Sequence, residues 1–262
     1  MPPLGPASLA DAYDECLRFA RERGGNFNTA FRLLPRAERQ AMNVLYAFFR
    51  YSDDIADEAG PVEAKLARLD AWREQVESAL YFRTASARML PAICDVVQRY
   101  GIRKEWLLEL LDGVAQDLRP VRFMTWTELE RYCHRVAGVV GFASLRVWGC
   151  TQESALGPAA AAGQAFQLTN ILRDLRDAAR SGRVYLPEEL WAPLGANPIE
   201  LTQDVLPTAW LQAAQTAAER AEKHYVAATV LSGYLPRQGR AIWYAMSGTY
   251  HAILDDLRRH NF

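Results

Sequence analysis

The sequence has few cysteines, and their spacing forms no recognisable pattern. Cys16, Cys94, Cys133 and Cys150 lie far apart, with no CxxC pair and no spacing typical of a zinc site. Isolated thiols of this kind are typical of proteins kept in a reducing compartment. The amino-terminal residues carry acids and lack the apolar core of a signal peptide. We therefore expect a reduced, cytoplasmic protein.

Long apolar runs and a surplus of either charge are also missing. The longest apolar stretches, such as residues 136–145, are well short of the roughly 18 residues that cross a bilayer. Lysine and arginine number 30 against 31 acids, a net charge of -1. This balance gives no sign of a nucleic-acid partner or of a basic membrane-binding patch. No transmembrane segment is expected; peripheral contact with a membrane and the oligomeric state stay open.

Alternating patterns typical of β-strands are absent, and the periodicity is helical almost throughout. Apolar residues recur at the spacing of an amphipathic helix at Leu107, Leu110, Leu111, Val114 and Leu118. Alanine-rich stretches at 159–165 and 209–221 add helix propensity. No repeat, linker or shift in composition marks a domain boundary. The sequence predicts an all-α fold, a single helical domain over residues 1–262.

Three aspartates stand close together within residues 46–57. On a helix, Asp53 and Asp57 are four residues apart and share one face, and Asp54 and Asp57 are also neighbours. Three carboxylates this close repel one another, and a divalent cation would relieve the repulsion. Magnesium prefers oxygen ligands and often bridges carboxylates to a substrate phosphate. The motif therefore predicts Asp53, Asp54 and Asp57 as magnesium ligands.

The neighbours of these aspartates bear on the interpretation. A solvated acidic face is the simpler explanation for the three aspartates taken alone. The apolar residues Phe48, Phe49 and Ile55 instead indicate a helix packed in the core. Arg50 lies one turn before the aspartates and Tyr46 one turn before Arg50, so both would face the same site.

A second polar stripe follows about 120 residues later. Asn170 and Asp174 stand at i and i+4, Asp177 follows at i+7, and Gln167 precedes Asn170 by nearly one turn. A continuous helix would place these oxygens on one face. Arg173 interrupts the stripe. Together the two stripes could hold magnesium ions around a diphosphate and help its C–O bond to ionise.

A basic turn leaves the second stripe at Arg180, Arg183 and Tyr185. Arginine forks suit phosphate oxygens. The aromatic residues near both stripes would line an apolar cavity, which suits a hydrocarbon tail and a carbocation that must be kept from water.

With these motifs in this order, the chain resembles the squalene/phytoene synthase family, which joins two prenyl diphosphates head to head. The resemblance covers about residues 27–257. It rests on four stretches, at 26–35, 46–57, 132–141 and 170–187. It implies a single helical bundle of the isoprenoid synthase type with a central cavity.

The resemblance also implies roles for individual residues. Asp53, Asp54 and Asp57 would form the first metal-binding motif, and Asn170 and Asp174 would belong to the second. The residues that would hold diphosphates or shape the reacting centre are Tyr46, Arg50, Arg173, Arg183 and Tyr185. We add as expected substrate contacts Phe27, Tyr132, Gln167 and Tyr250.

Some positions depart from the family pattern or need separate interpretation. The second motif usually reads N-x-x-x-D-x-x-x-D, and its last aspartate would fall at Ala178. Asp177 is either a substitute ligand or only a neighbour of that position. His134, where the family commonly has tyrosine, is read as a packed residue. Gly138 and Gly141 predict a close helix approach or a kink at the cavity wall.

Three functions stay open at this stage. The leading one condenses two farnesyl diphosphates to presqualene diphosphate, hydroxysqualene or squalene, because residues 26–27 look like those of bacterial, hopanoid-linked members. The second is phytoene synthesis from geranylgeranyl diphosphate. The third is a family-like assembly protein without catalysis, favoured only by Ala178. NADPH use stays open, although no Gly-rich dinucleotide fingerprint is present. Asp112 and Asp117 fit a metal cluster or a solvated face equally well.

Overall fold

The computed structural model describes residues 8–24, 29–82, 84, 87–119, 121–203 and 205–262. Helices dominate these residues, and their only β-type pairing is an isolated bridge between Arg122 and Val184. The predicted all-α fold is confirmed. None of the described helices is long and apolar enough to span a bilayer.

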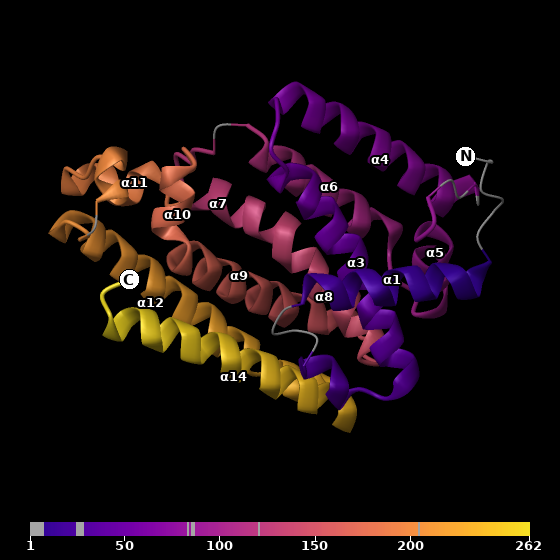
Figure 1. Ribbon diagram of the computed structural model, residues 1–262. Helices are drawn as coiled ribbons and strands as arrows, with labels where there is room; N and C mark the ends of the chain where they lie inside the picture. The colour runs from indigo at the N-terminus through magenta and orange to yellow at the C-terminus, as the bar shows by residue number, and fades with distance from the viewer. Residues whose placement is uncertain (1–7, 25–28, 83, 85–86, 120, 204) are drawn as a thin grey trace.

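The amino-terminal half packs around one long helix, α3, which Figure 1 shows in purple. The helices of this half are α1 (Leu9–Arg23), α3 (Arg36–Asp57), α4 (Val62–Phe82), α5 (Leu90–Arg99) and α6 (Lys104–Asp117). Helix α3 contacts all the others of this group. It begins directly after Pro35, and it buries apolar residues that include Leu45 and Phe48.

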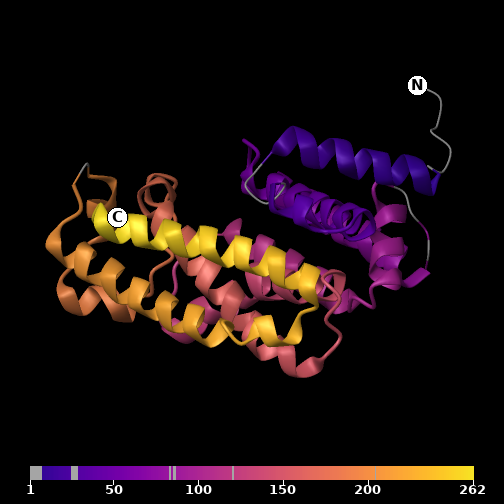
Figure 2. The same cartoon turned by 90° about the horizontal axis from the view of Figure 1, so that it is seen from below.

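The carboxy-terminal half packs around α9, with α12 and α14 running beside it (Figures 1 and 2). Its helices are α7 (Trp126–Cys133), α8 (Val139–Val147), α9 (Leu156–Arg173), α10 (Leu175–Arg180), α11 (Glu188–Trp191), α12 (Thr208–Ala228), α13 (Leu231–Tyr234) and α14 (Arg237–Arg259). Short 3₁₀ turns lie at Phe31–Leu33, Glu153–Ala155, Ala192–Leu194 and Pro198–Thr202, and a π-helical turn at His134–Gly138.

Glycine residues allow α9 to lie very close to the π-helical turn and to α8. A Cβ atom added at Gly163 on α9 would lie 2.8 Å from the backbone of Gly138, and one at Gly141 would lie 3.3 Å from the Ala159 carbonyl oxygen. Larger side chains would push the helices apart. The predicted close approach at Gly138 and Gly141 is therefore confirmed, and Gly163 supplies its other side.

Two groups of buried apolar side chains form the core, one around α3 and one around α9 and α12. Phe166 on α9 packs against both groups. Because Phe166 reaches both groups, side chains on this face of α9 and on α3 can border a common space.

Candidate active site

A cavity of about 550 Å³ lies between α3, α9 and α14. Along α3 its lining changes from the apolar Met42 to the polar Arg50 and Asp53, and along α9 from Ala159 to Asn170. The cavity therefore joins a polar region with a larger apolar one. The apolar lining includes Phe31, Phe49, Leu145, Trp148, Phe166, Leu231, Trp243 and Met246.

Many of the residues predicted from the sequence border this cavity. The predicted residues that line it are Tyr46, Arg50, Asp53, Gln167, Asn170, Arg173 and Tyr250. The predicted residues that are not part of its lining are Asp54, Asp57, Tyr132, Asp174, Asp177, Arg183 and Tyr185. Phe27 lies outside the described residues.

The first aspartate motif divides into two parts. The two oxygens of Asp54 each face an arginine: Oδ1 lies 2.7 Å from Arg50 Nε, and Oδ2 lies 3.0 Å from Arg23 Nη2. The Asp54 side chain is only 12% exposed. Asp54 thus holds two cavity-lining arginines in place, while Asp53 borders the cavity itself. Arg23, the last residue of α1, is a site residue that no sequence motif indicated.

Asp53 is exposed toward the cavity, although many protein atoms surround its carboxyl group. This burial is the main reason why the pKa of Asp53 rises from its ordinary 3.8 to about 7. Arg50 opposes the rise in the Asp53 pKa, and the negative charges of Asp57, Asp117 and Asp54 add to it. A carboxylate so placed gains by acquiring a positive partner.

Asp117, at the end of α6, lies beside the first motif. It accepts hydrogen bonds from the hydroxyls of Tyr132 and Tyr185, each at 2.9 Å. Burial raises the pKa of Asp117 to about 6, against the effect of these two hydrogen bonds and of Arg183. The negative charge of Asp57 adds to the rise in the Asp117 pKa. Asp117 thereby links Tyr132, Tyr185 and Arg183 to the aspartates of α3.

The second motif is not one continuous helix face, so that part of the sequence prediction is wrong. Helix α9 ends at Arg173, and Asp174 has the non-helical angles φ -99° and ψ 14° before α10 begins. The chain bends here on its way back toward Val121, whose carbonyl accepts the Val184 N–H at 3.2 Å. Two hydrogen bonds, of 2.7 and 2.6 Å, join the Asp174 carboxylate to the Arg173 guanidinium.

The side chain of Asp177 is 80% exposed and pairs with Arg180 at 2.9 Å. It does not line the cavity. Ala178, the position of the family's usual last aspartate, is buried, and its carbonyl accepts the Arg183 N–H at 2.9 Å. Position 178 therefore contributes to the packing of this turn.

Asn170 lines the cavity, as does Gln167 one turn before it. Its amide nitrogen lies 3.5 Å from Gln167 Oε1, and its side chain hydrogen-bonds Tyr250. The Asn170 Oδ1 atom is buried and has no hydrogen-bond partner among the described residues. An unpaired buried oxygen is costly unless a ligand completes it.

The squalene/phytoene synthase family model matches residues 20–262. The chain belongs to this family. A presqualene diphosphate synthase of Sinorhizobium fredii is 35% identical over 240 residues, covering 91% of this chain and 85% of that protein. A 15-cis-phytoene synthase of Synechococcus elongatus is 31% identical over 268 residues, covering 98% and 87%. The crystal structure of a squalene synthase from Alicyclobacillus acidocaldarius has a TM-score of 0.88 at 25% identity, covering 97% and 95%.

The prenyl synthase family typically depends on magnesium, and the residues of this site fit a hard cation. No three acidic, histidine or cysteine side chains of the described segments already come together as a metal site. The available donors are oxygens: the carboxylates of Asp53 and Asp57 and the unpaired Oδ1 of Asn170. Oxygen-only donor sets of this kind suit Mg²⁺, which keeps several positions for water and substrate phosphate.

The raised pKa of Asp53 predicts an effect on stability in the metal-free protein. Between pH 3.8 and about 7 the folded carboxyl keeps a proton that the unfolded one has lost, so stability falls as the pH rises through this window. Asp53→Asn has no titrating carboxyl group at this position, so it does not lose this stability as the pH rises. Allowing for screening by cavity water, we expect the metal-free variant to melt roughly 2–4 °C higher than wild type at pH 8.

Differential scanning fluorimetry in EDTA at pH 4.5 and pH 8 tests this expectation. The difference in Tm between Asp53→Asn and wild type should be small at pH 4.5 and should appear at pH 8. A variant that melts lower than wild type at pH 8 would contradict the account of Asp53.

Proposed function

We propose that this prenyl synthase condenses two farnesyl diphosphates head to head in a magnesium-dependent reaction carried out by one domain over residues 1–262. The product is a C30 compound, either presqualene diphosphate, hydroxysqualene or squalene. The observation that supports this proposal best is one cavity that joins Asp53 and Asn170 to a long apolar lining. A diphosphate with a hydrocarbon tail has that same division of polarity.

The arginines of the site are arranged to bind a diphosphate. Arg23 and Arg50 share Asp54, and Arg173 pairs with Asp174, so each guanidinium keeps further N–H groups free of its partner's two oxygens. Magnesium, when bound, would neutralise the leaving diphosphate and favour ionisation of the C–O bond.

The reaction then needs a dry, electron-rich wall. One farnesyl group loses its diphosphate, and the double bond of the second molecule attacks the resulting cation. Loss of a proton closes a cyclopropane that keeps the other diphosphate. Phe166 stacks on Tyr250 at 4.5 Å between centroids and on Trp243 at 6.2 Å, and all three line the cavity. Aromatic faces stabilise a cation and exclude water.

Purified protein, magnesium chloride and farnesyl diphosphate make the basic test. We expect release of diphosphate and a C30 product detectable by mass spectrometry, with NADPH added in a parallel reaction to detect reduction. If neither farnesyl nor geranylgeranyl diphosphate is turned over, the proposal of an enzyme is wrong and a non-catalytic assembly protein is favoured.

Phytoene synthesis from the C20 substrate is the alternative, since the curated relatives include synthases of both kinds at similar identity. The bulky side chains of Trp148, Leu231 and Trp243 border the cavity and limit the space for a hydrocarbon tail. This limit favours the shorter, C15 substrate. We expect wild type to prefer the C15 diphosphate.

Shortening one of these side chains should extend the cavity. Trp243→Leu is expected to raise the ratio of C20 to C15 turnover by about tenfold, since several methylene groups can then be buried. Trp191→Leu is the matched control, because Trp191 is equally buried but does not line the cavity. Competition assays with both substrates give the ratio directly; an unchanged ratio in Trp243→Leu would argue against this wall as the limit on length.

A further inference from the structure

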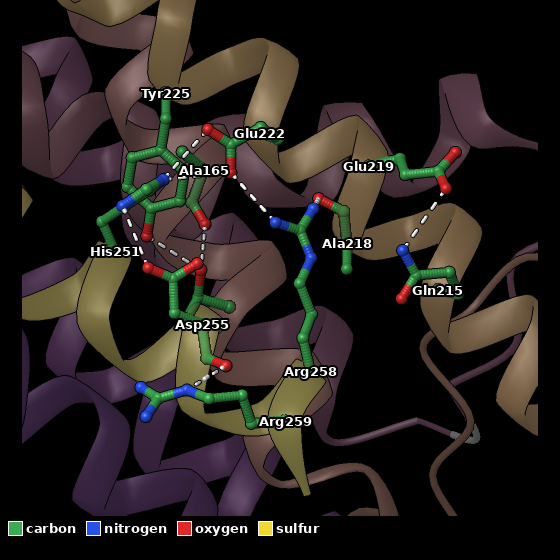
Figure 3. A network of polar contacts seen from close by, with 11 residues as sticks. Ala165, Gln215, Ala218, Glu219, Glu222, Tyr225, His251, Asp255, Arg258 and Arg259 are labelled. Atoms are coloured by element: carbon green, nitrogen blue, oxygen red, sulfur yellow. Dashed lines mark hydrogen bonds and ion pairs between the residues drawn. The ribbon is translucent and has the colours of Figure 1, made fainter. Parts of the chain in front are cut away.

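A network of polar side chains joins α9, α12 and α14 outside the cavity lining (Figure 3). Its members come from α9 (Thr169), α12 (Glu222 and Tyr225) and α14 (His251 and Arg258). None of them belongs to the sequence motifs of the family. The chemistry of the active site does not explain why these groups are held together.

The first connection runs between α9 and α12. Thr169 is fully buried, and its hydroxyl donates to the Ala165 carbonyl at 2.8 Å. A hydroxyl has one proton to give. The Tyr225 hydroxyl, 2.9 Å from Thr169 Oγ1, must therefore donate to it. A buried pair of this kind is sensitive to geometry, because the Tyr225 hydroxyl would become an unsatisfied polar group if it lost Thr169.

The second connection runs between α12 and α14. The His251 ring stands edge-on to the Tyr225 ring, with centroids 4.9 Å apart, and its Nε2 lies 3.0 Å from both carboxylate oxygens of Glu222. Arg258 donates to Glu222 at 3.2 Å and to the Ala218 carbonyl at 2.9 Å. Figure 3 shows Glu222 between His251 and Arg258. Helix α14 is thus attached to α12 at two points that are about two turns apart on α14.

Each end of this network is one residue away from the active site. Thr169 precedes Asn170 on α9, and His251 follows Tyr250 on α14. Asn170 and Tyr250 hydrogen-bond each other and both line the cavity. Besides the stacking of Phe166 on Tyr250 and Trp243, two polar connections therefore join α9 and α14. One is the direct pair of Asn170 and Tyr250, and the other runs from Thr169 through Tyr225 to His251. A rotation or slide of either helix would have to break both connections.

We propose that Tyr225 and His251 are positioning residues that fix Asn170 and Tyr250 for cation and diphosphate binding. This inference rests on the proposed function, because it assigns the network a part in assembling that site. The network acts through the helices and touches no substrate. Its loss should therefore raise the magnesium concentration that the site needs, even in fully folded protein.

The Tyr225–Thr169 bond gives the sharpest test, because each hydroxyl can be removed with little change in volume. The variants are Tyr225→Phe, Thr169→Val and the double variant. Calorimetry with inorganic diphosphate and increasing Mg²⁺, well below each variant's Tm, gives the Mg²⁺ concentration for half-saturation. We expect each single variant to raise it about fivefold, as for one lost hydrogen bond. The double variant should raise it no further, because both changes remove the same bond.

His251 is tested by a conservative rescue. His251→Leu should raise the Mg²⁺ half-saturation about fivefold, while His251→Gln, which keeps an N–H donor for Glu222, should stay within about twofold of wild type. Arg259→Gln is the matched control on the same helix. Arg259 is exposed, and its contacts lie within its own turn, at Asp255 and Asp256.

Activity assays on the same variants should show a change in Mg²⁺ dependence with kcat largely recovered at high Mg²⁺. Variants that melt at lower temperature but bind Mg²⁺ and diphosphate like wild type would reduce the network to a structural role and overturn the inference. If wild type turns over its substrate while the variants bind Mg²⁺ and diphosphate as wild type does, only the inference is wrong and the proposed function stands. Absence of diphosphate binding by wild type would overturn the proposed function and the inference with it.

Discussion

Asp53→Asn should lower kcat for farnesyl diphosphate by roughly a thousandfold while leaving the protein folded. Asp53 is the aspartate of the first motif that borders the cavity, and burial together with its acidic neighbours raises the pKa of its carboxyl group despite the nearby Arg50. Asparagine has nearly the same shape but no charge to hold a cation. The loss should therefore fall on catalysis and on Mg²⁺ binding, while the variant keeps its fold.

Steady-state kinetics over a range of Mg²⁺ concentrations measure this effect. Asp112→Asn serves as the control, because Asp112 lies on α6, is half-exposed and pairs with Arg73 outside the cavity lining. It should keep activity within about twofold of wild type. If Asp53→Asn is nearly as active as wild type, the first motif does not take part in catalysis.

Asp174→Asn should lower kcat by roughly a hundredfold or more, whereas Asp177→Ala should be nearly silent. Asp174 lies at the end of α9, where its carboxylate holds Arg173 at the cavity. Its loss would remove a negative charge beside the diphosphate site and release that arginine. Asp177 lies on the solvent side of α10 and pairs with Arg180.

The two variants are compared side by side for diphosphate release and for Mg²⁺ half-saturation. A large loss in Asp177→Ala would mean that Asp177 moves into the site when cations bind and replaces the aspartate missing at Ala178. Equal, small effects in both variants would contradict the assignment of the second motif.

Helical periodicity predicts which aspartates of the first motif share a face, but it does not predict which of them reaches the cavity. Asp53 and Asp57 share a helix face at any position of a straight helix, so their relation is fixed locally. The same rule also rotates Asp54 by about 100° from Asp53. In the structure that rotation turns Asp54 toward Arg23 and Arg50 and leaves Asp53 at the cavity. Which of two adjacent aspartates faces a partner depends on the packing of the helix.

The second motif shows where periodicity fails. The stripe from Gln167 to Asp177 assumed one straight helix, but the chain bends at Asp174 to bring residues 182–187 back beside α6 and α7. No glycine or proline marks this bend in the sequence. It arises from tertiary contacts, such as the Val184 N–H bonded to the Val121 carbonyl.

Long-range contacts also explain why Asp117 and Arg23 could not be assigned. Asp117 is identified as a site residue by the hydrogen bonds that it accepts from Tyr132 and Tyr185, which are 15 and 68 residues away in the chain. Arg23 reaches Asp54 from a different helix. Single charged residues without a periodic partner carry no local signal, so the fold itself had to place them.

The central claim is that Asp53 and Asn170 hold cations and a diphosphate between α3 and α9. Crystals of the wild-type protein soaked with Mn²⁺ and inorganic diphosphate test it directly, since Mn²⁺ takes the same oxygen ligands and scatters anomalously. We expect anomalous peaks from Mn²⁺ ions bound to the carboxylate of Asp53 and to Oδ1 of Asn170, with diphosphate between them. Peaks only at surface acids, with this cavity empty of metal, would contradict it.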